Sequence, residues 1–169
     1  MEKEQNNNIE IKERVINKIR NSKLIIIIFL IILSTIFVTI YVFKSISEKE
    51  NLQASEKYIR AGLFLASEKR EKSRALFEEI ILSKNKTYSI LALNAILEQN
   101  LESDERKILE YFRIVEKLKM PINQKNLILF KKALYLIKKS NIEEGNKLLK
   151  DIIKSESELK FIAEEIISD

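Results

Sequence analysis

The pattern of apolar and polar positions divides this chain into three parts. Residues 24–43 read LIIIIFLIILSTIFVTIYVF, twenty successive positions without a charge, a proline or a glycine. Twenty helical residues at a rise of ~1.5 Å cover ~30 Å, the thickness of a bilayer's hydrocarbon core. The pattern therefore predicts a single transmembrane helix at 24–43, preceded by a short polar tail at 1–23 and followed by charged, amphipathic sequence at 44–169.

The apolar segment is typical of an uncleaved anchor. The apolar core of a cleaved signal peptide is about 7–15 residues long and ends at a small-x-small site. This segment is longer, and it continues into Tyr41–Lys44 without such a site. Five basic residues lie in the twenty positions before it, against four in the equivalent window after it. This excess favours a cytoplasmic N-terminus and a C-terminal domain outside the membrane.

The tail at 1–23 has two interpretations. Its apolar residues recur at helical spacing among basic ones, and they are Ile9, Ile11, Val15, Ile16 and Ile19. A short amphipathic helix with this pattern would lie on an anionic membrane surface. A disordered tail is the other interpretation, and the sequence leaves both open.

Beyond residue 44, apolar residues recur at helical spacing and no segment reads as a strand. The first helix places Leu52, Ile59, Leu63 and Ala66 on one face. It either starts at the capping pattern Ser47–Glu50 or continues from the apolar segment. Six further helices follow, with N-terminal caps expected in four of them at Thr87, Ser103, Ser140 and Ser155. The short connections between them predict antiparallel neighbours.

Two segments 72 residues apart share a pattern of small and apolar positions. The matching residues are Ala61, Phe64, Ser73, Phe77 and Ile80 in one, and Ala133, Leu136, Gly145, Leu149 and Ile152 in the other. A middle copy, with Ala92, Ala95, Ile108, Phe112 and Val115, fits only with four extra loop residues. The pattern resembles a degenerate tetratricopeptide (TPR) repeat. The expected fold is all-α, with the N-terminal transmembrane helix followed by a TPR-like α-solenoid of about three helix pairs and a C-terminal capping helix. An irregular helical bundle is the alternative.

Composition excludes several kinds of chemistry. The chain has no cysteine and no histidine, which excludes disulfides, thiolate catalysis, Cys/His zinc sites and imidazole acid–base catalysis. Gly62 and Gly145 alone do not form a phosphate-binding loop, and the adjacent carboxylates of Glu78 and Glu79 do not face each other on a helix. We therefore expect no enzyme activity, no cofactor, no metal and no small-molecule substrate. The net charge of +5 is spread along the chain, and Glu71 interrupts the basic run 69–74, so no nucleic-acid partner is expected.

Stacked helix pairs form a concave surface that accepts a peptide or a partner helix. The first helix of each pair lines that surface. By repeat position, the expected partner-binding residues are Tyr58, Leu65, Leu93, Ile96, Phe130, Leu134 and Ile137. The alternative for each of them is ordinary packing in the core or between repeats.

The whole arrangement resembles a bacterial family, the YfgM-like tetratricopeptide proteins of the inner membrane. The resemblance covers nearly the whole chain and is strongest in Leu52–Ile81, LQASEKYIRAGLFLASEKREKSRALFEEII. It implies a single-pass inner-membrane protein with a periplasmic TPR-like domain, ancillary to the Sec translocon. Translocon subunits or periplasmic chaperones would then be its partners in protein export or envelope protein folding. The alternative is a structural single-pass membrane protein of cell division or of a secretion apparatus.

Overall fold

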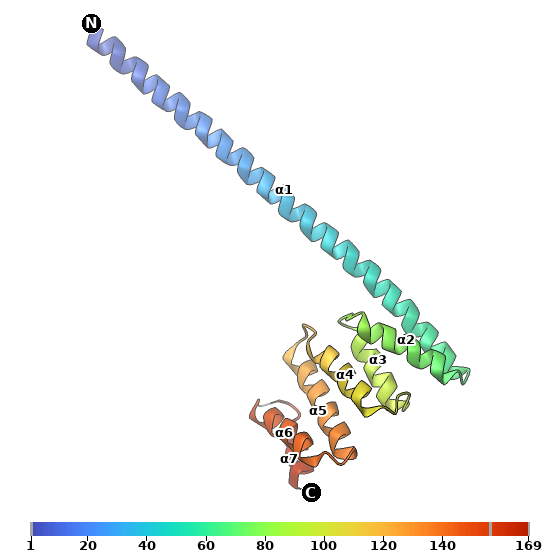
Figure 1. The fold of residues 1–169 in the computed structure, drawn as a ribbon. Coiled ribbons are helices and arrows are strands. Elements are labelled where there is room, and N and C mark those ends of the chain that lie inside the picture. Colours follow the sequence, from blue (N-terminus) through green and yellow to red (C-terminus); the bar gives the residue numbers. More distant parts are fainter. Residues whose placement is uncertain (1, 156, 169) are drawn as a thin grey trace. The chain divides into compact units, whose positions relative to one another are not determined.

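The computed structural model describes residues 2–155 and 157–168, with side chains from residue 27 onward. Helices account for all regular structure in these residues, which confirms the all-α class (Figure 1). They are α1 (Glu2–Ala66), α2 (Arg70–Leu82), α3 (Tyr88–Glu98), α4 (Glu105–Glu116), α5 (Ile122–Lys138), α6 (Ile142–Lys154) and α7 (Lys160–Ser168). The chain divides into two compact units, Met1–Lys49 and Glu50–Asp169, and each is described by itself.

Helix α1 contains the predicted transmembrane segment. Its backbone is helical from Glu2, and in the part of the chain that the structure describes it is the one helix long and apolar enough to cross a membrane. The hydroxyls of Thr35 and Thr39 each donate to the carbonyl four residues earlier at 2.7 Å, so these polar groups are satisfied within the helix. The helix continues through Ser47–Glu50, so the first helix of the second unit is not a separate element. The expected amphipathic pattern of residues 1–23 lies outside the described side chains.

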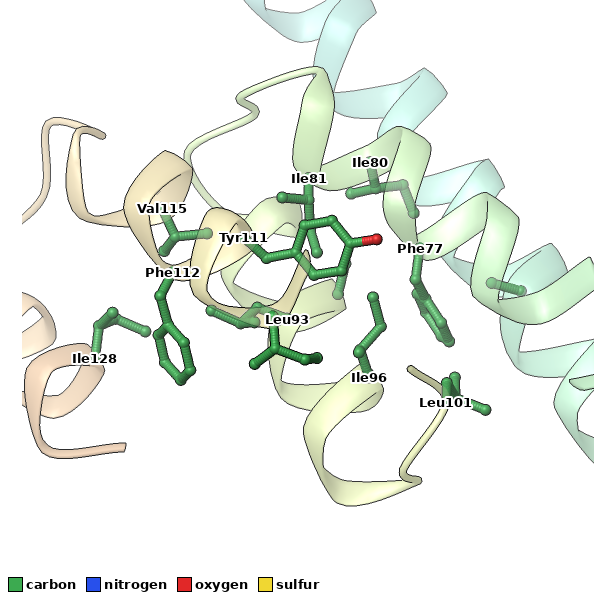
Figure 2. Packing of buried hydrophobic residues seen from close by; sticks show 13 residues of the cluster. Phe77, Ile80, Ile81, Leu93, Ile96, Leu101, Tyr111, Phe112, Val115 and Ile128 are labelled. Atoms are coloured by element: carbon green, nitrogen blue, oxygen red, sulfur yellow. The ribbon is translucent and has the colours of Figure 1, made fainter. Parts of the chain in front are cut away.

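In the second unit each helix packs against the next one along the chain, and α2 also contacts α4. Figure 2 shows the main core, where side chains from α2, α3 and α4 meet Ile128 of α5. Its largest fully buried side chains include Phe77, Tyr111 and Phe112. Burying one such side chain stabilises the fold by roughly 1.5–3 kcal/mol. A second cluster, Ala133, Leu149, Ile152 and Ala163, joins α5, α6 and α7.

The small residues of the sequence repeat lie where helices cross closely. Ala61, Ser73, Ala133 and Gly145 are all buried. A Cβ atom on Gly145 would lie 2.9 Å from the carbonyl oxygen of Ala133, closer than carbon and oxygen normally approach. The absence of a side chain at Gly145 therefore allows α6 to lie directly against the backbone of α5.

The face of α1 that contacts the core is not the one with the largest apolar residues. Leu52, Ile59 and Leu63 are 61%, 59% and 63% exposed. The helix instead packs through a neighbouring face that contains Ala54 and Ala61, both buried, with two larger residues, Tyr58 and Leu65, against the main core. Two alanines allow α1 to lie close to α2, and the Tyr58 ring meets the Phe77 ring edge-on with a centroid separation of 5.4 Å.

Three helices end with the same hydrogen-bonded cap. Glu68, Asn100 and Ser140 follow α1, α3 and α5, and each has a positive φ, at 60°, 47° and 64°. The N–H of each of these residues donates to the carbonyl three positions earlier in the chain. The N–H of the residue that follows donates to the carbonyl five positions before itself. This is the Schellman motif, whose left-handed position glycine usually occupies. Here residues with side chains occupy it.

Two expected caps are wrong by one residue. Asp104, not Ser103, caps α4, and its carboxylate accepts the N–H of Arg106 at 2.9 Å. The residue before α6 is Asn141, because Ser140 already closes α5 in the left-handed conformation. For α3, the expected cap Thr87 makes no side-chain cap bond. The side chain of Asn85 accepts the N–H groups of Thr87 and Tyr88 instead.

Candidate functional site

A groove of about 390 Å³ lies between the C-terminal end of α3, the start of α4 and the outer face of α5. Its apolar surface comes from all three helices and consists of Ile96, Leu97, Ile108, Leu134 and Tyr135. Charged and polar groups surround this surface, and they are Glu98, Asn100, Glu102, Lys131, Lys138 and Lys139. The volume is in the range of ligand-binding pockets, which combine an apolar lining with a few polar groups.

Helix α5 forms one wall of the groove. Lys131, Leu134, Tyr135 and Lys138 follow each other at intervals of three, one and three residues, which places them on one helical face. The opposite face of α5, with Phe130, Ala133 and Ile137, packs against the α6–α7 side of the unit. Packing behind the wall therefore holds it in place.

Ion pairs fix the distance between this wall and its neighbours. Lys131 donates to the side-chain oxygen of Asn94 at 2.8 Å and lies 3.8 Å from the Glu98 carboxylate, so it ties α5 to α3. Lys132 lies 2.9 Å from the carboxylate of Glu116, and both side chains are largely buried, which ties α5 to α4. Partly buried pairs resist screening by salt better than exposed ones. The groove is therefore largely pre-formed.

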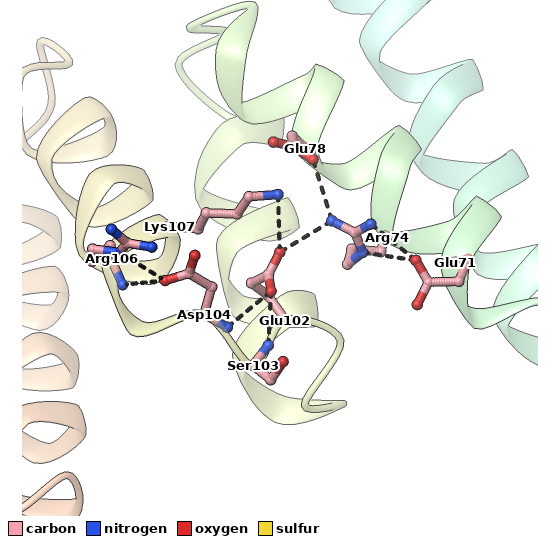
Figure 3. Close-up of polar contacts among 8 residues, drawn as sticks. All are labelled: Glu71, Arg74, Glu78, Glu102, Ser103, Asp104, Arg106 and Lys107. Atoms are coloured by element: carbon pink, nitrogen blue, oxygen red, sulfur yellow. Dashed lines mark hydrogen bonds and ion pairs between the residues drawn. The ribbon is translucent and has the colours of Figure 1, made fainter.

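The Glu102 carboxylate holds the loop between α3 and α4 at one edge of the groove (Figure 3). Its side chain is only 9% exposed, and its oxygens lie 3.0 Å from Arg74 and 3.5 Å from Lys107. It also accepts the N–H groups of Ser103 and Asp104 at 2.9 Å. These contacts lower the pKa of Glu102, and the hydrogen bond from the Asp104 N–H lowers it most. The carboxyl is therefore ionised at neutral pH.

The same loop is held from the other side by α2. Arg70 donates to the carbonyl oxygens of Gln99 and Asn100. Arg74 contacts carboxylates of α2 as well as Glu102, and its pKa is raised, first by the hydrogen bond to Glu71. Arginine is therefore a permanent cation here, and the loop has a fixed shape along the groove.

Tyr135 gives the groove its aromatic surface. Its ring centroid lies 6.0 Å from that of Phe112, and the ammonium group of Lys139 lies 5.9 Å from the ring centroid. Burial raises the pKa of Tyr135, and nearby carboxylates, Glu105 first, raise it further. The hydroxyl therefore stays protonated at neutral pH and can donate a hydrogen bond. Among the described residues, no group of three or more Asp, Glu, Cys or His side chains could hold a metal ion.

The seven partner-binding residues expected from the sequence lie in different surroundings. Leu93 and Ile96 are fully buried in the main core, and Ile96 also lines the base of the groove. Tyr58 and Leu65 are half-buried against the main core, and Phe130 and Ile137 pack on the second cluster. Leu134 is 38% exposed and lines the groove. The groove thus contains two of the seven residues.

Sequence reasoning did not find the charged residues of the groove. The chain has many lysines, and nothing in their type distinguishes Lys131, Lys138 and Lys139. Only their helical spacing relative to Leu134 and Tyr135 could have indicated that they share a face. Glu102 gave no signal, because its partners Arg74 and Lys107 come from two different helices.

No protein-family model, no curated protein and no solved structure matches this chain. Its function must therefore be inferred from its own residues and their geometry.

Proposed function

We propose that this protein is a membrane-anchored protein-interaction module whose groove binds a peptide segment of a partner protein. The observation that carries the proposal is the pre-formed groove, with an apolar base, a protonated tyrosine and charged edges held by ion pairs. Such surfaces recognise a few apolar side chains of a peptide and orient them through polar groups. The apolar part of α1 would anchor this unit to the membrane.

Packing of the second unit supports a TPR-like solenoid. From α2 to α7 each helix contacts its successor, and α2 also contacts α4 two positions later. Small residues at matching positions of the repeat, Ala61 with Ser73 and Ala133 with Gly145, are buried, and Gly145 lies directly against the backbone of α5. Repeats of this kind stack into a surface that binds peptides or helices. On the resemblance to YfgM-like proteins, the unit would face the periplasm and bind translocon subunits or periplasmic chaperones.

A structural role in the membrane is the second candidate. It is favoured by the exposed apolar residues Leu52, Ile59 and Leu63 of α1, which offer a surface to another helix. An anchor swap separates the two functions. A module that acts through its groove keeps its partners when residues 24–43 are replaced by an unrelated transmembrane helix. A protein recruited through its membrane helix loses them.

Site-specific photo-crosslinking in native membranes tests the groove directly. A photoreactive amino acid replaces Leu134 in the groove or, as a control, Leu82 of α2, which is 52% exposed and does not line the groove. We expect the Leu134 position to capture a defined set of proteins that the Leu82 position does not. Equal capture at both positions would refute the groove as the binding site.

The identity of the captured proteins tests the resemblance separately. Translocon subunits or periplasmic chaperones are expected among them. If neither appears, the role in protein export is wrong, although the groove remains the binding surface. Protection of the C-terminal unit from protease added to spheroplasts would contradict the periplasmic orientation.

A further inference from the structure

The charged groups of the groove differ in how far they are already neutralised. Glu102 is ionised and lies beside Arg74 and Lys107, and Glu98 lies 3.8 Å from Lys131. Both carboxylates of the groove therefore have cationic partners within the protein. A partner with basic residues would have to compete with these existing pairs.

Two lysines of the groove have no such partner. In the part of the chain that the structure describes, Lys138 makes no ion pair or hydrogen bond, and Lys139 only lies over the Tyr135 ring at 5.9 Å. Both side chains are exposed at the C-terminal end of α5. The charge that the groove leaves unneutralised is thus positive, and it lies at one end of the apolar base.

The spacing between the lysines and the apolar base is short. Leu134 and Lys138 are four residues apart on α5, so they are neighbours on the helix surface at about 5–6 Å between Cβ atoms. Tyr135 lies beside Leu134 on the same face, and its ring centroid is 5.9 Å from the Lys139 ammonium group. One short segment that carries an apolar side chain and a carboxylate side by side would meet all of these groups.

We propose that the groove binds a segment of a partner protein in which an apolar residue is flanked by Asp or Glu, with the apolar side chain on Leu134 and Tyr135 and the carboxylate on Lys138 and Lys139. This inference rests on the proposed function, since it names the class of peptide that the groove binds. In a helical segment the acidic residue stands three or four positions from the apolar one. In an extended segment it stands one or two positions away.

Peptide selection on the full chain tests the proposal. The protein, held in nanodiscs of neutral phosphatidylcholine, is offered a displayed library of random twelve-residue peptides. The same selection is run on the Leu134→Asp variant, which places a charge in the apolar base, and on the double variant Lys138→Gln/Lys139→Gln. The matched control is Lys147→Gln/Lys150→Gln, which removes two exposed lysines of α6 outside the groove.

We expect the wild type to enrich apolar residues flanked by Asp or Glu. The enriched peptides should bind the Lys138→Gln/Lys139→Gln variant roughly three- to ten-fold more weakly, as expected for two exposed ion pairs. They should bind the α6 control as tightly as the wild type, and a Lys138→Arg/Lys139→Arg variant should restore binding. Circular dichroism confirms that each variant is folded.

Four outcomes would overturn the inference, and they differ in what else they affect. Peptides that need Leu134 but carry no acidic preference would leave the proposed groove function standing. If the preference for acidic peptides persists in the Lys138→Gln/Lys139→Gln variant, the peptide carboxylate binds to other residues than these two lysines. No enrichment that depends on Leu134 would overturn the groove function as well. If nanodiscs with anionic lipid abolish selection, the two lysines bind headgroups and not a peptide.

Discussion

Gly145 offers the sharpest test of how the helices pack. A Cβ atom added there would lie 2.5 Å from Cγ1 of Ile137 and 2.9 Å from the carbonyl oxygen of Ala133. The Ile137 side chain can change its rotamer, but the Ala133 oxygen belongs to the backbone of α5 and moves only with the helix. In the Gly145→Ala variant α5 and α6 must therefore separate by several tenths of an ångström.

The expected cost combines two opposing effects. Overfilling a tightly packed site typically costs about 1–3 kcal/mol. Alanine gains about 1 kcal/mol over glycine in a helix interior. The Gly145→Ala variant should therefore lose about 1 kcal/mol of unfolding free energy, and up to ~2 kcal/mol if α6 cannot shift.

Gly62 provides the matched control. It lies in α1, and nothing is within 4 Å of the position where its Cβ would be. The same substitution there has no packing cost, so Gly62→Ala should gain up to ~1 kcal/mol from helix propensity alone. The same Gly→Ala substitution should therefore lower the unfolding free energy at Gly145 and raise it at Gly62.

Denaturant unfolding of the full chain in detergent micelles, followed by circular dichroism, measures both variants. The midpoint should fall for Gly145→Ala and rise for Gly62→Ala, with an unchanged slope against denaturant concentration. If Gly145→Ala is as stable as the wild type while Gly62→Ala is stabilised, the close approach of α5 and α6 is refuted.

Three further predictions test other parts of the molecule. The buried Tyr111 hydroxyl has no hydrogen-bond partner among the described residues, so Tyr111→Phe should raise the unfolding free energy by about 1 kcal/mol in denaturant titrations; a loss would indicate a bond to the nearby Glu78 carboxylate. The folded-state pKa of Glu102 lies below its ordinary 4.5, so its charge stabilises the fold above that pH. Unfolding curves between pH 7 and pH 3 should therefore show Glu102→Gln less stable than the wild type at neutral pH, with the difference disappearing as the pH falls below about 4.5; a constant difference would contradict this role. Ile32→Arg places a charge near the middle of the apolar segment, at a cost of roughly 3 kcal/mol for insertion, so a glycosylation-mapping assay in microsomes should show reduced membrane insertion; unchanged insertion would argue against residues 24–43 as the span.

Local sequence signals predicted the helices well. Apolar spacing located α2 to α7, and the shift of 72 residues identified small residues at Ala133 and Gly145, which lie in contact between α5 and α6. These features depend on residues close in sequence or on side-chain size alone. They could be predicted because helix periodicity and the need for small residues at close crossings are general.

The features that the sequence did not predict correctly depend on contacts between residues that are distant in the sequence. Helix α1 carries two apolar faces, and the choice of Ala54 and Ala61 over Leu52 and Ile59 follows from how closely α2 approaches. Similarly, Lys131 on the groove wall of α5 reaches Asn94 of α3, a partner 37 positions earlier in the chain. Periodicity gives the faces of one helix but does not say which face another helix covers.

The caps at Glu68, Asn100 and Ser140 have a consequence for how the sequence can change over time. A residue with a side chain in the left-handed conformation costs roughly 1 kcal/mol relative to glycine, and less for asparagine. Glu68 and Ser140 do not line the groove, and replacing these two exposed residues by glycine would therefore add about 2 kcal/mol in total. That unused reserve is comparable to the cost of one or two ordinary destabilising substitutions. Lineages that acquire such glycines could tolerate more change at the groove, and so reach new partners, before the helical unit ceases to fold.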